Sequence, residues 1–266
     1  MPTALITGAS SGIGYAFAYA LASKGMNLIL VARSEDKLNA LAQTLMDEWK
    51  IDARAIAQDL TKPDAAVTVA DAVAAQGLTV DMLINNAGFG DYGAFSDRPR
   101  QRHLDMIQLN IAALVDLTYQ FLPGMQHRRS GTIINIASIA GFQSMPYLSV
   151  YAATKAFVLS FTEALWAETK PYNIRVIVSC PGPTETRFFQ EAQFPETMRS
   201  VSPGQVIQPE TIVQDVLDEL DSDIPTIVSG GVLSKVVVNL SRFLPRPTMV
   251  NIIEKQFRPR TEENNG

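Results

Sequence analysis

Tyr151 and Lys155 are two residues of complementary chemistry, four positions apart in the segment SVYAATKAFVLSFTEALWAET. The apolar positions of residues 149–169 predict one long helix, on which side chains four apart share a face. An ammonium beside a phenol favours the tyrosinate, so Lys155 is expected to lower the pKa of Tyr151 below its ordinary value of about 10. Such a phenol can donate or accept a proton near neutral pH. The pair alone also fits an incidental surface contact.

A glycine-rich turn, Gly8-Ala-Ser-Ser-Gly-Ile-Gly14, lies between a predicted strand (residues 3–7) and a predicted helix (residues 13–24). This arrangement is typical of the phosphate-binding entrance of dinucleotide folds. Glycines let the backbone approach the pyrophosphate, and the helix N-terminus offers free N–H groups and the positive end of its dipole. The spacing is GxxxGxG and differs from the GxGxxG fingerprint.

Arg33 follows the second predicted strand (residues 27–32), where a cofactor without a 2′-phosphate would need a carboxylate on its ribose. A guanidinium instead suits a 2′-phosphate, which it can hold with paired charge-assisted hydrogen bonds. The sequence therefore predicts NADP(H) rather than NAD. Glu35 and Asp36 lie close by, so a solvated loop charge at Arg33 is the alternative.

Further polar residues follow the later predicted strands, which cover residues 53–57, 80–84, 131–137, 174–179 and 226–229. Asp59 could accept a hydrogen bond from an adenine amino group, or cap the next helix. The Asn85-Asn86-Ala87-Gly88 run suits a loop that lines a cofactor, or an ordinary turn. Asn110 lies in an apolar run of a predicted helix (residues 97–126), and a buried asparagine there needs a hydrogen-bond partner.

Two segments near the C-terminus are rich in apolar residues. Residues 187–208 contain Phe188, Phe189, Phe194, Met198 and two prolines with little periodicity, which predicts a mobile lid with an apolar inner surface. Residues 231–266 form a basic, amphipathic tail with helical spacing from Leu233 to Leu244. The tail is expected to pack on the domain or on a partner subunit. A peripheral membrane contact is the alternative, which three basic residues support only modestly.

The composition excludes several classes of function. A net charge of −5 over 266 residues argues against non-specific nucleic-acid binding. Cys180 is the one cysteine, so no internal disulfide can form, which fits a reducing compartment. His103 and His127 have no cluster of metal ligands around them, and no metal site is expected. Without a signal-like N-terminus or an apolar run of about 18 residues, a cytoplasmic protein is expected.

Strands alternate with helices along the whole chain, without an internal repeat or a linker. This pattern predicts one α/β domain with a Rossmann-type, doubly wound parallel sheet of about seven strands and helices on both faces. The dinucleotide-binding and catalytic domain is expected to cover residues 1–230.

The motifs, taken in order, resemble those of the classical short-chain dehydrogenase/reductase family over roughly residues 3–230. The residues that carry the resemblance are Thr7-Gly8-Ala-Ser-Ser-Gly12-Ile-Gly14, Asn85-Asn86-Ala87-Gly88, Asn110, Ser138, Tyr151-Ala-Ala-Thr-Lys155 and Pro181-Gly182. Within the family, Asn86-Ala-Gly-Phe-Gly-Asp-Tyr-Gly and the basic tail look similar to bacterial members labelled ketone or 3-oxoacyl reductases.

The resemblance implies a role for each matching residue. Tyr151 would be the general acid toward a carbonyl oxygen, and Ser138 would hydrogen-bond the same oxygen. Lys155 would hold the nicotinamide ribose, and Asn110 would position a water in a proton relay. The residues implied to bind the cofactor are Gly8, Ser10, Ser11, Gly12, Ile13, Gly14, Arg33, Asp59, Leu60, Asn86, Ala87, Gly88, Tyr151, Lys155, Pro181, Gly182, Thr184 and Thr186.

These observations together predict an NADPH-dependent reductase of an apolar ketone, aldehyde or 3-oxoacyl group. The resemblance further implies a homodimer or homotetramer that pairs through the helices of Asn110 and Tyr151. Three alternatives stay open: an NAD-dependent alcohol dehydrogenase, an NADP-binding regulatory protein without turnover, and a lipid carbonyl reductase that the tail holds at a membrane.

Overall fold

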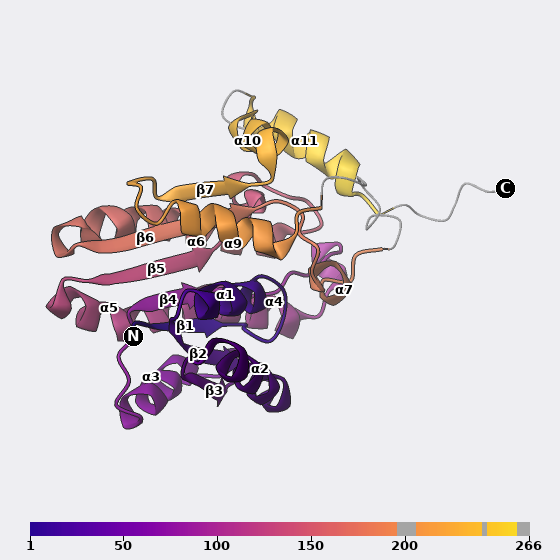
Figure 1. Ribbon diagram of the computed structural model, residues 1–266. Coiled ribbons are helices and arrows are strands. Elements are labelled where there is room, and N and C mark those ends of the chain that lie inside the picture. Colours follow the sequence, from indigo (N-terminus) through magenta and orange to yellow (C-terminus); the bar gives the residue numbers. More distant parts are fainter. Residues whose placement is uncertain (196–205, 241–243, 260–266) are drawn as a thin grey trace.

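Seven strands form one parallel sheet in the computed structural model, which describes residues 1–195, 206–240 and 244–259 (Figure 1). They are β1 Thr3–Thr7, β2 Asn27–Ala32, β3 Ala53–Ala57, β4 Met82–Asn85, β5 Gly131–Ile136, β6 Ile174–Pro181 and β7 Thr226–Ser229. Their order is β3-β2-β1-β4-β5-β6-β7, and every neighbouring pair is parallel. The order reverses between β1 and β4, and open parallel sheets bind ligands at the carboxyl ends of the strands beside such a switch point.

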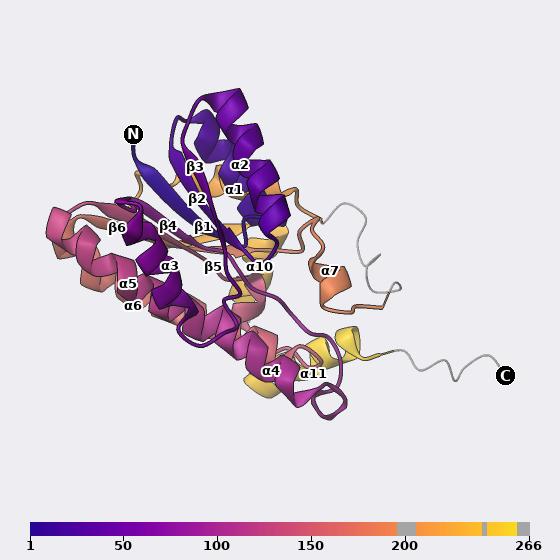
Figure 2. The same cartoon turned by 90° about the horizontal axis from the view of Figure 1, so that it is seen from below.

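Helices cover both faces of this sheet (Figure 2). On one face lie α1 Gly12–Ser23, α2 Glu35–Trp49 and α9 Pro209–Asp218, and on the other lie α3 Ala65–Ala75, α5 Ala113–Arg128 and α6 Ser149–Thr169. Phe17, Leu38 and Val216 belong to the first buried core cluster, and Val69 and Leu117 belong to the second. Because both faces are covered, the central strands are aliphatic at nearly every position rather than alternating. The predicted fold class is confirmed.

The predicted continuous helix over residues 97–126 is wrong in detail. A 3₁₀ turn (Phe95–Asp97) and α4 (Arg100–Ile107) lead into a π-helical turn (Gln108–Ala112) before α5 begins. The wider turn holds Asn110, whose side chain hydrogen-bonds outside the helix, and π-bulges of this kind often occur at functional sites. Apolar periodicity alone does not reveal such a turn.

In the predicted amphipathic tail, the described residues form two helices, α10 (Gly231–Leu240) and α11 (Arg246–Phe257). Met249 and Ile253 of α11 are buried in a cluster with Tyr151, so α11 packs on its own chain. No helix within the described ranges has both the length and the apolarity needed to cross a membrane. Residues 241–243 and 260–266 of the predicted tail lie outside the described residues.

The predicted lid begins with a short helix, α7 (Phe188–Glu191), next to the side of the sheet toward which the strands run (Figure 1). Phe194 after it is buried, and its ring stacks on that of Tyr92 at a centroid distance of 4.8 Å. Farther along, residue 207 pairs with Thr184 as a single β-bridge. Residues 196–205 of the predicted lid, Met198 among them, lie outside the described residues.

A chain of four polar side chains crosses the core between β4, β5 and the two helices behind them. Asn85 donates through Nδ2 to Thr118 Oγ1 (3.1 Å) and to Asn135 Oδ1 (2.9 Å). Asn135 in turn donates to Thr162 Oγ1 at 2.9 Å. All four residues are buried, and this hydrogen-bonded chain ties the sheet to α5 and α6. Of these two helices, α5 begins just after Asn110 and α6 carries Tyr151 and Lys155.

Candidate active site

A cavity of about 1440 Å³ opens at the carboxyl ends of the strands. It collects nearly all of the predicted site residues from seven separate segments of the chain. Lining it are Gly8, Ser10, Ser11, Gly12, Ile13, Arg33, Asp59, Leu60, Asn86, Ala87, Gly88, Ser138, Tyr151, Lys155, Pro181, Gly182, Thr184 and Thr186. Only Gly14 and Asn110 of the predicted set lie behind its wall.

Tyr151 and Ser138 form the centre of the cavity. Ser138 follows β5, and its Oγ accepts a hydrogen bond from the Ala140 N–H at 3.1 Å, which fixes the side chain at the start of a 3₁₀ turn. Tyr151 lies in the first turn of α6, is 9% exposed, and shares a side-chain hydrogen bond with Ser138. Two hydroxyl groups are thus held together where a carbonyl oxygen can meet both.

The pKa of Tyr151 differs from the prediction. Burial raises it to about 12, and the hydrogen bond from Ser138 opposes this only in part. The Lys155 Nζ lies 5.8 Å from the centroid of the Tyr151 ring, so its charge does not outweigh the lost hydration of the phenolate. The expectation of a lowered pKa is therefore wrong for this structure, and Tyr151 holds its proton at neutral pH.

Lys155 is a buried cation whose Nζ donates to the Ile136 carbonyl at 2.8 Å. Burial lowers the pKa of its ammonium to about 8, because a charged form loses hydration inside the protein. A lysine in this range can gain or lose a proton near neutral pH, which a proton relay requires.

Asn110 has the hydrogen-bond partners that the sequence leads us to expect. Its Nδ2 donates to the Phe89 carbonyl and to Thr154 Oγ1, both at 3.0 Å, and its Oδ1 accepts from the Phe89 N–H at 3.1 Å. The side chain therefore fixes the backbone at Phe89, beside the cavity. The role in positioning a water, which the resemblance implies, stays a prediction.

The glycine turn fits tightly against the Asn-Ala-Gly turn. A Cβ on Gly14 would lie 2.5 Å from both Asn86 Nδ2 and the Gly8 carbonyl oxygen, so α1 can approach β1 only with glycine at this position. Asn86 Nδ2 donates to the Thr7 carbonyl at 2.8 Å, and Thr7 Oγ1 accepts from the Asn86 and Ala87 N–H groups. Gly14 and Asn86 thus hold the glycine turn in its conformation, Gly14 by close packing and Asn86 by hydrogen bonds.

Arg33 and Asp59 lie at the far end of the cavity, where β2 and β3 end. Arg33 is exposed, and no hydrogen bond or ion pair is recorded for its side chain within the described ranges. Asp59 Oδ1 accepts from the Thr61 N–H (3.0 Å) and from Thr61 Oγ1 (2.8 Å). Partial burial raises the pKa of Asp59, but these hydrogen bonds outweigh it and hold the pKa below its usual value.

These residues fit a nicotinamide dinucleotide. The glycine turn leaves the N-terminus of α1 open toward the cavity, where backbone N–H groups can bind a pyrophosphate. The cavity continues from there to an exposed guanidinium on one side and to Tyr151 and Lys155 on the other. No group of His, Cys, Asp and Glu residues that could hold a metal occurs in the described part of the chain.

The other end of the cavity is apolar, and the sequence revealed only part of it. Phe188, Phe189 and Phe194 of the predicted lid line this end, and Phe89 lies with them. This end is also lined by residues that were not predicted from the sequence, among them Met145, Leu148, Gln256 and Phe257. Phe257 alone among these four residues belongs to a helical pattern in the sequence. Positions 249, 253 and 257 follow helical spacing, but the predicted tail pattern did not include them.

Gln143 adds a polar group to this apolar end. It lines the cavity, and its Oε1 is shielded from solvent without a hydrogen-bond partner in the described part of the chain. Buried amide oxygens are normally hydrogen-bonded. This oxygen is therefore an acceptor that a ligand in the cavity can use.

Fold and site together define a dinucleotide-binding α/β protein with a buried tyrosine that can transfer a proton. The family model for short chain dehydrogenases matches residues 2–196, and the chain belongs to this family. It is an oxidoreductase of the kind that acts on carbonyl and alcohol groups with a nicotinamide cofactor.

Two curated relatives differ in how much of their length they share. The chain is 30% identical to a 7beta-hydroxysteroid dehydrogenase of Mediterraneibacter gnavus over 227 residues, 85% of each chain. It is 38% identical to a very-long-chain 3-oxoacyl-CoA reductase of Phaeosphaeria nodorum over 177 residues, 65% of this chain. The chain spans about half (52%) of the length of that reductase.

Solved structures of relatives hold either form of the cofactor. A short-chain dehydrogenase from Sphingobium yanoikuyae in complex with NADPH is 30% identical, with a TM-score of 0.81 over 100% of this chain and 99% of its own. A 3-oxoacyl-[acyl-carrier protein] reductase from Brucella melitensis with bound NAD is 25% identical, with a TM-score of 0.75 over 86% of this chain and 90% of its own.

Proposed function

We propose that this protein reduces an apolar carbonyl compound with NADPH, and that Tyr151 donates the proton to the carbonyl oxygen. The observation that carries the proposal is the buried Tyr151, hydrogen-bonded to Ser138 in the same cavity as the glycine turn, where burial raises its pKa to about 12. The carbonyl oxygen of the substrate becomes an alkoxide as the hydride arrives at the carbonyl carbon. A neutral phenol close to that oxygen can donate the proton that the alkoxide needs.

Four residues have separate roles in the proposed reaction. Ser138 orients the carbonyl oxygen by a hydrogen bond, and Tyr151 protonates it. NADPH, when bound, supplies the hydride. Lys155, with its pKa lowered to about 8, can return a proton to Tyr151 and hold the nicotinamide ribose. Asn110 keeps the wall at Phe89 in place, so that the carbonyl meets both hydroxyl groups.

The apolar end of the cavity supports a substrate with a large apolar body. Aromatic rings from three segments line it, at Phe89, Phe188, Phe194 and Phe257. The names of the two relatives, a hydroxysteroid dehydrogenase and a very-long-chain 3-oxoacyl-CoA reductase, agree with bulky apolar substrates. The acceptor at Gln143 favours a substrate that carries a second polar group, such as a hydroxyl.

The preference for NADPH over NADH rests on Arg33. Its guanidinium lies at the end of β2 on the rim of the cavity, where it makes no hydrogen bond or ion pair in the described part of the chain, and it can pair with a 2′-phosphate. Because such charge-assisted pairs contribute about 1.5–3 kcal/mol, Arg33→Ala should reduce the NADPH/NADH selectivity by roughly 10- to 100-fold. An NAD-dependent enzyme would lose no selectivity with this variant.

Pairing of subunits through α5 and α6 is part of the proposal. Tyr119 of α5 is 73% exposed and Phe157 of α6 is 41% exposed, as is Ile107 at the end of α4. Large apolar side chains that are exposed on these helices support a subunit interface there.

The test is NADPH consumption with a panel of bulky ketones, small ketones, aldehydes and 3-oxoacyl thioesters. Tyr151→Phe should lower kcat by about 10²- to 10⁴-fold, because it removes the proton donor while leaving the ring in place. The affinity for NADPH, measured by fluorescence titration, should change little. Full activity of Tyr151→Phe would refute the assigned role, and tight NADPH binding without turnover would favour a regulatory protein.

A further inference from the structure

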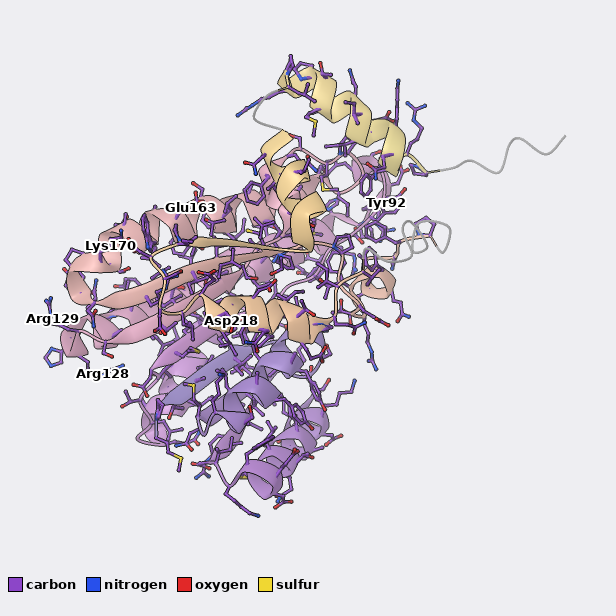
Figure 3. The ribbon with its side chains drawn as sticks, turned by 45° about the horizontal axis from the view of Figure 1, so that its top comes forward. Tyr92, Arg128, Arg129, Glu163, Lys170 and Asp218 are labelled. Carbon is purple, nitrogen blue, oxygen red and sulfur yellow. The ribbon has the colours of Figure 1, made fainter. Side chains whose placement is uncertain are left out.

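The Phe-Gly-Asp-Tyr-Gly segment at residues 89–93, here called the hub segment, contacts parts of the chain that are far apart in sequence. Its Tyr92 N–H donates to the Ala192 carbonyl at 2.8 Å, just after α7. The Gly93 N–H donates to the Tyr147 carbonyl at 2.9 Å, just before α6. Tyr92 Oη donates to the Phe257 carbonyl at 2.7 Å, at the end of α11 (Figure 3).

Asp91 is the charged centre of the hub segment, and its side chain is fully buried. Oδ1 accepts from Arg102 Nε and Arg98 Nη2, both at 2.6 Å, and Oδ2 accepts from Arg98 Nε at 2.7 Å. Both arginines come from the start of α4 or the turn before it. Three charge-assisted hydrogen bonds hold this one buried carboxylate. Because a planar guanidinium donates its hydrogen bonds in fixed directions, the three residues form a rigid unit.

The same two arginines also hold the segment that contains α7. Arg98 Nη2 donates to Gln193 Oε1 at 2.7 Å, and Arg102 Nη2 donates to the Glu191 carbonyl at 2.5 Å. Each guanidinium thus bonds Asp91 on one side and the α7 segment on the other. The unit of Asp91, Arg98 and Arg102 therefore joins α7 to α4 and to the hub segment.

The position of α7 determines the cavity wall beside the Tyr151 hydroxyl. The ring of Phe188 in α7 lies 5.1 Å from the ring of Tyr151, centroid to centroid. It reaches that place over Gly90, where a Cβ would lie 2.6 Å from Phe188 Cζ. A shift of α7 would move this ring and reshape the apolar end of the cavity, whereas in the described part of the chain no hydrogen bond or ion pair joins the unit to the glycine turn.

We propose that Asp91, Arg98 and Arg102 are positioning residues that fix α7 against Tyr151 and so determine the fit of bulky apolar substrates. They act through Phe188, and of the three only Arg102 also lines the cavity. The proposal rests on the proposed function for its substrate class. It predicts that loosening the unit weakens the binding of bulky ketones, affects small ketones less, and leaves the binding of NADPH unchanged.

Two variants loosen the unit by different degrees. Arg98→Met removes both the fork on Asp91 and the bond to α7, while Arg102 still pairs with Asp91. Gln193→Ala removes only the bond between Arg98 and the α7 segment and leaves the buried ion pairs intact. The matched control is Arg54→Met, which breaks an exposed Arg–Asp pair on β3.

Steady-state kinetics give the first measurement. For Arg98→Met, the KM of a bulky ketone should rise at least tenfold, with a smaller rise for a small ketone and an NADPH Kd within twofold of the wild type. Gln193→Ala should raise the same KM about threefold, and Arg54→Met should change nothing. An unchanged KM in Arg98→Met, or an equal loss of NADPH binding, would overturn the proposal.

Hydrogen exchange of the NADPH-loaded protein gives a second measurement that needs no turnover. The N–H groups of Glu191, Ala192 and Phe194 are hydrogen-bonded within the α7 segment. In Arg98→Met they should exchange at least tenfold faster, while amides of β1 and β4 keep their protection. Unchanged exchange at α7 would overturn the positioning role. A wild-type protein without turnover would refute the proposed function instead, and the exchange result would still decide this proposal.

Discussion

The two ends of the cavity are built in different ways. At the cofactor end, backbone and small residues of two short motifs pack against each other, as Gly14 does against Gly8 and Asn86. The substrate end instead depends on large side chains from several segments of the chain, such as Tyr92, whose hydroxyl donates to the Phe257 carbonyl 165 positions away. Changes at the cofactor end should therefore affect folding and NADPH binding together, whereas changes at the substrate end should affect KM alone.

Gly14→Ala should have the largest effect and test the rigidity of the cofactor end. The new Cβ would lie 2.5 Å from a backbone oxygen and 2.9 Å from the Gly8 carbonyl carbon, and these atoms cannot rotate away. Overpacking of this kind costs about 3 kcal/mol of unfolding free energy, and the displaced turn should weaken NADPH binding by roughly tenfold or more. Urea denaturation and fluorescence titration measure the two quantities.

Gly124→Ala is the control for this prediction. Gly124 lies in α5, and its Cβ would approach only the flexible end of Arg128, at 3.1 Å. Alanine favours a helix over glycine by about 1 kcal/mol, so this variant should be as stable as the wild type or more so. If Gly14→Ala were as well tolerated as Gly124→Ala, the cofactor end would be far more pliable than its contacts indicate.

Lys155→Met should have the second largest effect, at the border of the two ends. It removes the proton relay and should abolish turnover, yet it should raise the free energy of unfolding by about 1–3 kcal/mol at pH 7, because the buried ammonium is replaced by a thioether of similar size. Thermal denaturation of the protein without cofactor measures the gain.

The pH dependence of that gain checks its cause. The pKa of Lys155 is lowered in the folded state, so the unfolded chain binds more protons between pH 8 and the ordinary lysine range. The stability of the wild type should therefore rise with pH in this window, and the advantage of Lys155→Met should shrink. A gain that stayed constant across this window would show that packing, not charge burial, is responsible.

Ile253→Ala should have the smallest effect and test how independent the substrate end is. Ile253 is buried in the same core cluster as Tyr151, whereas its neighbour Ile252 is 51% exposed and provides the matched control. We expect the KM of a bulky ketone to rise about three- to tenfold, the unfolding free energy of the core to fall by less than about 1 kcal/mol, and Ile252→Ala to change neither. A loss of about 2–5 kcal/mol would mean that α11 unfolds together with the sheet.

The same contrast explains what the sequence could predict. The strands, the glycine turn and the placing of Tyr151 and Ser138 follow from local patterns, because consecutive residues fix their geometry. Most predicted strands match the structure within two residues. Residues of the substrate end, such as Met145 and Phe257, carry no local signal of their role, since only tertiary packing brings them to the cavity.

The pKa values were harder to predict from the sequence than the positions of the residues. The spacing of Tyr151 and Lys155 indicates that they are neighbours, but the pKa of the phenol depends on how completely the fold removes water from it. The π-helical turn at Asn110 is likewise set by hydrogen bonds to Phe89 and Thr154, which no helical periodicity encodes.

The buried Asn–Thr chain between β4 and β5 also selects one alignment of these strands during folding. Both strands are otherwise aliphatic, and a slip by two positions would still bury apolar side chains against both helix layers. Such a slip would separate Asn85 from Asn135 and break the hydrogen bond between them, at a cost of about 1–3 kcal/mol for each buried group that loses its partner. The polar chain thus favours the native register of β4 and β5, because a misaligned sheet is less stable.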